Sequence, residues 1–377
     1  MTKTWSEQQV IAIIKSVLKP IVAKGAHDLL DDGASLPPCP KGHTRVVSCD
    51  AFQEGTDFIA NELSPLQSAG HRAVIQNLSD LSALGAKPVG FVWSLEIPKS
   101  WLDKNAEKLR QFCQGTTKTC LKKNLKFYGG DLSFSQSQFS CTITIFGDVK
   151  GRPLNRRGAK PGDGLYLSKP VGASAAGLRE LLRAVVESSS LQITPTHPEQ
   201  TMEINSNIVI PHLVRDPGFH GFRNKSGMTE RVINAHLYPD DEGEIGRTLV
   251  GLASACMDVS DGLSQDLYKL CQASGVSAII SHLDVAIDPL VKDWPDAKQL
   301  VLSSGEEYAL LFTASAEKVK KLQKKIRPRT IVKIGEIVSS KQKKSLQVFL
   351  KKNQELILVE QSGHDHFSSF SLDQAFL

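Results

Sequence analysis

Residues 255–263 read Ala255-Cys256-Met257-Asp258-Val259-Ser260-Asp261-Gly262-Leu263. The apolar start of this stretch ends at two acidic residues beside a glycine, and a helix pattern follows. Its apolar residues, Leu263, Leu267 and Leu270, recur at the spacing of one helix face, and Gly275 can end the helix in a left-handed conformation. The stretch therefore predicts an acidic turn that leads into a buried helix.

An acidic residue beside glycine recurs at four further places. These are Asp31-Asp32-Gly33, Asp50 with Glu54-Gly55, Gly129-Gly130-Asp131 and Gly305-Glu306-Glu307. Carboxylates are hard oxygen ligands that favour Mg²⁺ or Ca²⁺, and glycine lets a phosphate group approach the backbone closely. Together the five clusters predict a phosphate site that holds several metal ions.

Each cluster also has a purely structural interpretation. Ser260 or Asp261 can cap the following helix, and Gly129-Gly130-Asp131 is typical of a turn. Asp80, near the end of a helix pattern, fits a solvated polar face, although an acid there opposes the helix dipole. Arg156-Arg157 fits either surface charge or a clamp for ATP phosphates. Because caps do not readily explain five clusters in one chain, their joint occurrence favours the phosphate site.

Strand patterns alternate with helix patterns, which predicts a mixed α/β fold. In the first half we expect helices at 6–22, 66–84 and 101–124, and strands at 45–52, 91–97, 125–128 and 139–145. In the second half we expect helices at 173–187, 263–275 and 317–326, and strands at 165–167, 277–281, 300–303, 308–313 and 330–334. The Gly- and Pro-containing stretch 150–163 predicts a linker between domains 1–150 and 151–377, with a polar insertion near 188–230.

Composition narrows the class of protein. The 377 residues are 41% hydrophobic and 23% charged with a net charge of +5, as in an ordinary globular chain. No apolar run approaches the roughly 18 residues that span a bilayer, so we expect no membrane protein. The seven cysteines are scattered without a CxxC pair, which predicts reduced thiols in the cytoplasm. The P-loop and GxGxxG nucleotide motifs are absent from the sequence.

The positive charge is concentrated in residues 318–352, which contain 13 Lys and Arg residues and the single acid Glu336. The segment lacks interleaved aromatic residues beyond Phe349, and its lysines fit a solvated helix face. We therefore do not expect nucleic acid as a partner.

The order and spacing of the motifs resemble those of the thiamine-monophosphate kinase family. The matching segments are Asp31-Asp32-Gly33-Ala34, residues 50–58, Asn77-Leu78-Ser79-Asp80-Leu81, Gly129-Gly130-Asp131, residues 157–163, Asp258 to Leu263, Gly305-Glu306-Glu307-Tyr308 and residues 363–367. The resemblance implies the aminoimidazole-ribonucleotide-synthetase-like (PurM-like) fold, with two α/β domains. It also implies a homodimer in which the N-terminal sheets of two subunits pair into a barrel.

The resemblance also implies roles for individual residues. The magnesium ligands would be Asp31, Asp50, Asp80, Asp131, Asp258 and Asp261, with Cys49 contributing a backbone contact. ATP would contact Gly130, Arg156 and Ser260. Thiamine monophosphate would contact Asp57, Glu306 and Phe367. The implied reaction is direct in-line transfer of a phosphoryl group from ATP to thiamine monophosphate with Mg²⁺, and it needs no general base.

The chain departs from the family pattern mainly on the acceptor side. Asp57 replaces the usual histidine, Leu29-Leu30 replace glycines, Leu132-Ser133 replace threonines and Glu307 replaces the common aspartate. These departures keep two alternatives open. One is another ATP-using enzyme of the same superfamily, such as a hydrogenase-maturation, selenophosphate or purine-synthesis enzyme. The other is a non-catalytic homologue that binds ATP and magnesium.

Overall fold

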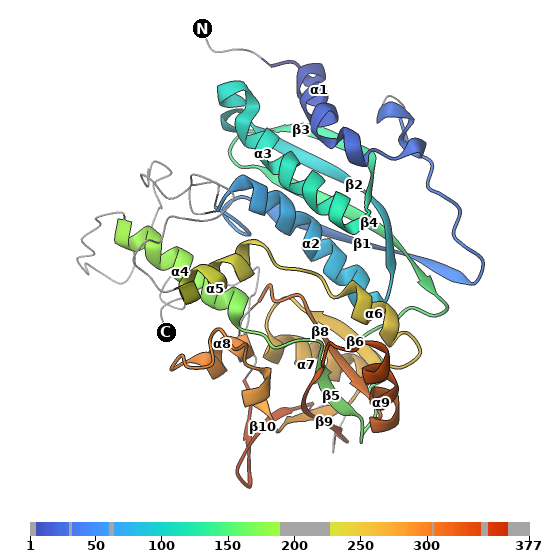
Figure 1. The fold of residues 1–377 in the computed structure, drawn as a ribbon, viewed down its shortest axis with the longest axis vertical. Coiled ribbons are helices and arrows are strands. Elements are labelled where there is room, and N and C mark those ends of the chain that lie inside the picture. Colours follow the sequence, from blue (N-terminus) through green and yellow to red (C-terminus); the bar gives the residue numbers. More distant parts are fainter. Residues whose placement is uncertain are drawn as a thin grey trace.

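The structure is a computed structural model that describes residues 5–29, 32–59, 64–188, 227–303, 305–340 and 346–360. It has the expected mixed α/β fold, with one sheet of four strands and another of seven. Figure 1 shows the smaller sheet with its helices in the upper part of the view and the larger sheet in the lower part. The smaller sheet comes from residues 43–150 and the larger from residues 164–358.

The four-stranded sheet has the order β1-β4-β2-β3. Its strands are β1 (His43–Gln53), β2 (Lys87–Pro98), β3 (Lys126–Ser135) and β4 (Ser140–Lys150). β2 and β3 are parallel, and the other neighbours are antiparallel. The alternating residues Cys141, Ile143 and Ile145 of β4 are buried, as the period of two requires for a strand with one covered face.

Helices cover the inner face of this sheet. They are α1 (Glu7–Leu18), with short turns at Lys19–Ile21 and Lys24–Leu29, α2 (Leu66–Leu84) and α3 (Lys99–Lys123). α2 ends where Gly85 adopts a left-handed φ of 75°, as its sequence predicts. The buried core under the sheet contains Phe91, Phe112 and Trp101.

The seven-stranded sheet has the order β11-β10-β7-β9-β5-β8-β6. Its strands are β5 (Gly164–Leu167), β6 (Ala255–Val259), β7 (Ser277–Ile280), β8 (Ala309–Ala314), β9 (Val332–Val338), β10 (Val348–Lys352) and β11 (Glu355–Leu358). The helices of this half are α4 (Ala173–Ser188), α5 (Gly227–Leu237), α6 (Gly243–Leu249), α7 (Leu263–Ser274), α8 (Ala297–Ser303) and α9 (Ala316–Lys325), with a short turn at Leu283–Ala286.

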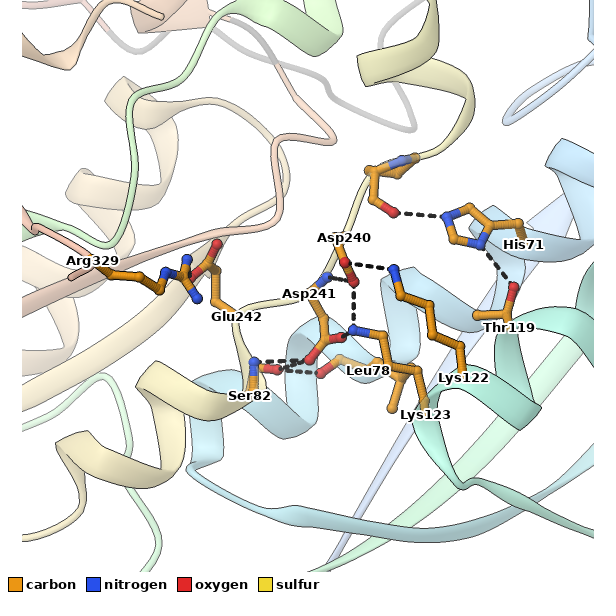
Figure 2. A network of polar contacts seen from close by, with 12 residues as sticks. His71, Leu78, Ser82, Thr119, Lys122, Lys123, Asp240, Asp241, Glu242 and Arg329 are labelled. Atoms are coloured by element: carbon orange, nitrogen blue, oxygen red, sulfur yellow. Dashed lines mark hydrogen bonds and ion pairs between the residues drawn. The ribbon is translucent and has the colours of Figure 1, made fainter. Parts of the chain in front are cut away.

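The segment 239–242, between α5 and α6, ties the two halves together (Figure 2). The His71 ring on α2 contacts the Pro239 carbonyl and the Thr119 hydroxyl, both at 2.7 Å. Lys122 on α3 pairs with Asp240 at 2.9 Å, and the Ser82 hydroxyl donates to Asp241 at 3.0 Å. These contacts fix the connection that follows α5 against α2 and α3.

Two predicted elements differ from the structure. The strand expected at 125–128 continues to Ser135, because a bulge at Gly129, where φ is 122°, lets β3 keep pairing with β2. Residues 300–303 end α8 instead of forming a strand, since so short an apolar run does not distinguish a strand from a buried helix. Most of the polar insertion, residues 189–226, lies outside the described residues.

None of the described helices is long and apolar enough to cross a membrane. All seven cysteines are free thiols, and five of them are buried. The domain boundary at residue 150 stays a prediction.

Candidate functional site

Three of the predicted acids converge where the two sheets meet. Asp50 is on β1, Asp80 on α2 and Asp258 on β6. Asp50 and Asp80 share a side-chain hydrogen bond, and Ser48 donates its hydroxyl hydrogen to Asp80. Ser79, beside Asp80 on α2, donates to Asp258 at 2.7 Å. Elements far apart in sequence therefore bring three carboxylates into one cluster.

The electrostatics of this acidic cluster, Asp50, Asp80 and Asp258, reflect its crowding. Burial and the negative charge of Asp258 raise the pKa of Asp50 to about 6. Burial and Asp50 raise the pKa of Asp80 to about 6, and burial and Asp80 raise the pKa of Asp258 to about 7. Each carboxylate thus becomes harder to ionise because its neighbours are ionised as well.

The acidic cluster fits a divalent cation by its donor chemistry. Carboxylate oxygens are the ligands that Mg²⁺ prefers, and a cation would offset the repulsion that raises the three pKa values. Among the residues that the structure describes, no group of three or more His, Cys, Asp or Glu side chains is already arranged to hold a metal ion.

A cleft of about 520 Å³ adjoins the acidic cluster. Its lining includes Ser48, Asp80, Asp258, Arg156 and Arg157. The positive charge of Arg156 opposes the upward shift in the pKa of both Asp80 and Asp258. The cleft therefore places an exposed guanidinium next to the half-buried carboxylate of Asp80 and the buried carboxylate of Asp258. This arrangement suits a phosphate chain with its counter-ions.

The carboxylate of Asp266 holds the loop 258–262 through hydrogen bonds to its backbone. This carboxylate is completely buried, and it accepts hydrogen bonds from the backbone N–H groups of Ser260 and Asp261, each at 3.0 Å. Lys269 pairs with Asp261 and, at 3.0 Å, with Asp266. Gly262 is the residue that precedes α7, and no side chain caps that helix. The capping interpretation of Ser260 and Asp261 is therefore wrong.

Asp131 and Cys49 lie on the other face of the small sheet. Asp50 pairs with Ile143, which faces the helices, whereas Asp131 pairs with Ser94, which faces outward. Asp131 is exposed and does not join the acidic cluster. The Cys49 side chain also points outward, where it accepts from the Thr144 hydroxyl at 3.3 Å. Any contact of Cys49 with a metal at Asp50 would have to use its backbone.

Two of the residues expected to bind the acceptor, Asp57 and Glu306, lie beside the acidic cluster. Glu306 is in the loop before β8 and pairs with Arg72 of α2. Asp57 accepts a hydrogen bond from the Gln53 N–H at 2.6 Å, and its negative charge raises the pKa of Asp50. Glu307 points elsewhere and accepts from the N–H groups of Gly172 and Ser174 at 2.8 and 3.1 Å. It therefore tethers the start of α4.

Two further site predictions, Asp31 and Phe367, lie outside the described residues. Gly130 is within β3, one residue before Asp131. Sequence patterns alone do not point to Arg72, His236, Ser79, Asp266 or Lys269 as residues of the site. For Arg72 the sequence contains one sign of burial. Apart from Arg72 itself and the neighbouring His71, residues 69–74 are small or apolar.

Comparisons with known proteins bear on the fold and the family of the chain. Residues 30–149 match the model of the AIR synthase related protein, N-terminal domain, and residues 243–347 match its C-terminal domain. The solved structure of AaThiL complexed with AMPPCP and TMP superposes with a TM-score of 0.66 at 23% identity, covering 97% of this chain and 100% of the other. The hydrogenase maturation protein HypE in complex with ATP gives a TM-score of 0.67 at 14% identity, covering 97% of both chains. At these identities the two structures establish the fold alone.

Similarity of sequence bears on the family as well as on the fold. The thiamine-monophosphate kinase of Buchnera aphidicola subsp. Schizaphis graminum is 30% identical over 344 residues, which cover 90% of this chain and 92% of that protein. The match therefore spans both halves and the acidic cluster between them. On this relationship, the chain belongs to the thiamine-monophosphate kinase family.

Proposed function

We propose that this protein transfers the γ-phosphoryl group of ATP to thiamine monophosphate, giving ADP and thiamine diphosphate. The convergence of Asp80, Asp258 and Arg156 around one cleft, with Asp50 hydrogen-bonded to Asp80, carries the proposal. Family membership supports the choice of acceptor, since the relatives bear the name thiamine-monophosphate kinase and AaThiL is complexed with AMPPCP and TMP.

We infer Mg²⁺ as the cation of the acidic cluster. Asp50, Asp80, Asp258 and Asp261 would hold it, and the family resemblance adds Asp31 and the backbone of Cys49. Asp131, which the resemblance also implies, faces away from this cluster and is not part of the proposed ligand set. Bound Mg²⁺ neutralises charge on the phosphate groups of donor and acceptor. Buried carboxylates that repel one another support this assignment.

The protein's own groups bind and orient the two substrates. Arg156 steadies the triphosphate, with Gly130 and Ser260 as further ATP contacts, while Asp57, Glu306 and Phe367 contact the acceptor. A phosphate oxygen of the acceptor attacks the γ-phosphorus in line, and the bond to the bridging oxygen breaks so that ADP leaves with its electron pair. Because the acceptor phosphate is ionised at neutral pH, no residue has to act as general base.

We also propose a homodimer that forms through the outer face of the small sheet. Val47 leaves 58% of its surface exposed on this face, and its cross-strand neighbour Phe146 is only partly buried. Pairing with a second copy would cover these apolar side chains. The seven free thiols support a reducing, cytoplasmic location. We retain two domains, 1–150 and 151–377, as part of this proposal.

An acceptor panel tests the proposed function. Purified protein with ATP and MgCl₂ is given thiamine monophosphate, thiamine or inorganic phosphate, and ADP release is measured against a sample without acceptor. We expect ADP only with thiamine monophosphate, and thiamine diphosphate as its partner product. ADP release with another acceptor would indicate a different ATP-using enzyme of this fold. ATP binding without turnover across the panel would indicate a binding protein.

A further inference from the structure

Arg72 is a buried cation at the junction of the two halves. It is on α2 with only 2% of its side chain exposed, and its guanidinium lies 5.5 Å from the centre of the Phe52 ring. One of its terminal nitrogens donates to Oε1 of Glu306, in the loop before β8. The pair therefore connects a helix of the first half to the loop of the second half in which we expect the acceptor to bind.

The other oxygen of Glu306 faces His236 of α5. Nδ1 of His236 is 3.6 Å from Oε2 of Glu306 and 3.3 Å from the Ser174 hydroxyl. Burial and the positive charge of Arg72 lower the pKa of His236 to about 3, so this ring is neutral at physiological pH. The segment that follows α5 is itself fixed to α2 and α3 (Figure 2). Arg72 therefore supplies a positive counter-charge to Glu306, and the neutral ring of His236 lies beside the other oxygen of the carboxylate.

The backbone also holds Glu306 in place. Its φ of 55° and that of Tyr308 at 49° lie in the left-handed region, which residues other than glycine rarely adopt. The Glu306 N–H bonds to the Ser260 carbonyl at 2.8 Å, and the Tyr308 N–H bonds to the Val259 carbonyl at 3.0 Å. The surroundings therefore impose an unfavourable conformation, as is common at ligand sites. The Glu306 side chain remains 28% exposed.

Arg72 retains an unused donor. Its Nε is buried and makes no hydrogen bond. The negative charges of Glu306 and Asp57 and the Tyr308 side chain favour the protonated form of Arg72 and raise its pKa, although burial opposes this. A buried cation with an unsatisfied N–H is costly to keep for packing alone.

We propose that Arg72 is a positioning residue for the acceptor. It holds the Glu306 carboxylate in the orientation that accepts a hydrogen bond from an amino-substituted heteroaromatic ring, such as the aminopyrimidine of thiamine monophosphate. This inference rests on the proposed function, because the role of Glu306 follows from the family resemblance. It predicts that Arg72 controls binding of the acceptor and leaves binding of ATP unaffected.

The test compares Arg72→Met, Arg72→Lys, Glu306→Gln and the double variant with wild type. KM is measured for both substrates, thiamine monophosphate binding is measured by calorimetry without ATP, and Tm reports stability. We expect Arg72→Met to raise the KM and Kd of the acceptor about 10- to 100-fold, the loss typical of a charged hydrogen bond, with the KM of ATP within about twofold. Arg72→Lys keeps the charge, so we expect it to bind the acceptor more tightly than Arg72→Met and less tightly than wild type.

The double variant separates positioning from independent effects. If Arg72 acts through Glu306, Arg72→Met adds little to the affinity loss already caused by Glu306→Gln. Arg179→Met is the matched control, because Arg179 also pairs with a carboxylate, Asp296, and stacks on Trp294, but it does not line the cleft beside the acidic cluster. It should leave both KM values unchanged.

The possible results distinguish a failure of the role proposed for Arg72 from a failure of the proposed function. An equal rise in both KM values, or a loss of Tm with an unchanged acceptor KM, overturns the role of Arg72 while leaving the proposed function intact. If Arg72→Met does not fold, Arg72→Lys and Glu306→Gln decide the matter, since an unchanged acceptor Kd in both contradicts the proposal. Wild-type protein that releases no ADP with thiamine monophosphate contradicts the proposed function itself.

Discussion

The hydroxyl of Ser79, on α2, donates a hydrogen bond of 2.7 Å to the carboxylate of Asp258, on β6. Both residues are buried, and the bond links the helix of the small sheet to the edge strand of the large one. Because this bond favours the ionised form, it opposes the rise in the pKa of Asp258 that burial and Asp80 cause. Ser79 therefore helps Asp258 to ionise within the acidic cluster.

Ser79→Ala should weaken both stability and turnover. We expect a loss of about 1–3 kcal/mol in unfolding free energy, because the buried carboxylate loses a partner, and a fall of about 3- to 10-fold in kcat/KM for ATP. Ser82→Ala is the control, since Ser82 is also buried on α2 but donates to Asp241. Denaturant titration and steady-state kinetics make the comparison. Equal kinetic losses in both variants would contradict a specific link to Asp258.

Arg156→Met should weaken the binding of ATP. The Arg156 guanidinium lines the cleft beside Asp80 and Asp258. Its loss should remove the charged contacts that we propose for the triphosphate. We expect the KM of ATP to rise about 10- to 100-fold with little change in the KM of the acceptor. Arg152→Met serves as control, because Arg152 is an exposed residue of the same linker outside the cleft. An unchanged KM of ATP for Arg156→Met would remove Arg156 from the site.

Asp261→Asn should stop turnover and leave the fold intact. Lys269 keeps its pairing with Asp266 at 3.0 Å, and the backbone of the loop stays bonded to Asp266. We expect a loss of at least about 100-fold in kcat with an unchanged Tm. Asp266→Asn should show the opposite balance, with a clear loss of Tm, since that carboxylate is fully buried under the loop. A normal rate for Asp261→Asn would show that the site is assigned wrongly.

Local signals and the family resemblance together predicted the acidic cluster. Asp50, Asp80 and Asp258 each lie in an apolar strand or helix pattern, and the order of motifs matched a family whose fold brings them together. For Asp131 the same signals do not predict on which face of the sheet its side chain lies. A one-residue bulge at Gly129 decides which face of β3 carries its side chain, and a period of two gives no warning of a bulge.

The pairing of Arg72 with Glu306 was equally inaccessible. The two residues are 234 positions apart, and their contact depends on how α2 packs against the second half. A basic residue in a helix pattern is ordinarily assigned to the surface. The small and apolar neighbours of Arg72 are a sign of its burial, but they do not identify Glu306 as its partner. Glu307 shows the reverse case, since the sequence placed it at the site and the structure uses it to tether α4.

Asp57→Asn should tighten binding of the acceptor. The substitution removes a negative charge where an anionic phosphate is expected, while the amide oxygen can still accept from the Gln53 N–H. We expect the KM of thiamine monophosphate to fall about 3- to 10-fold, and Asp57→His to lower it further by adding a possible cation. Glu317→Gln on α9, another removed acid, should change nothing. If all three variants match wild type, position 57 does not contact the acceptor.

Glu307→Gln should change how stability depends on pH. Burial raises the pKa of Glu307 to about 7 from an ordinary value of 4.5, although Lys169 and the N–H groups of Gly172 and Ala175 oppose the shift. Between these two values the folded state holds a proton that the unfolded state has released. The stability that this proton contributes is therefore complete below pH 4.5 and is lost as the pH rises through 7.

Denaturant titrations at pH 5 and pH 8 measure this effect. Wild type should lose up to roughly 3 kcal/mol more unfolding free energy than Glu307→Gln between the two conditions. The glutamine cannot ionise, yet its carbonyl oxygen can still accept from the N–H groups at the start of α4. At pH 8 the variant should therefore be the more stable protein. Parallel pH profiles for the two proteins would mean that Glu307 is ionised in the folded state and that its tether to α4 is an ordinary charged cap.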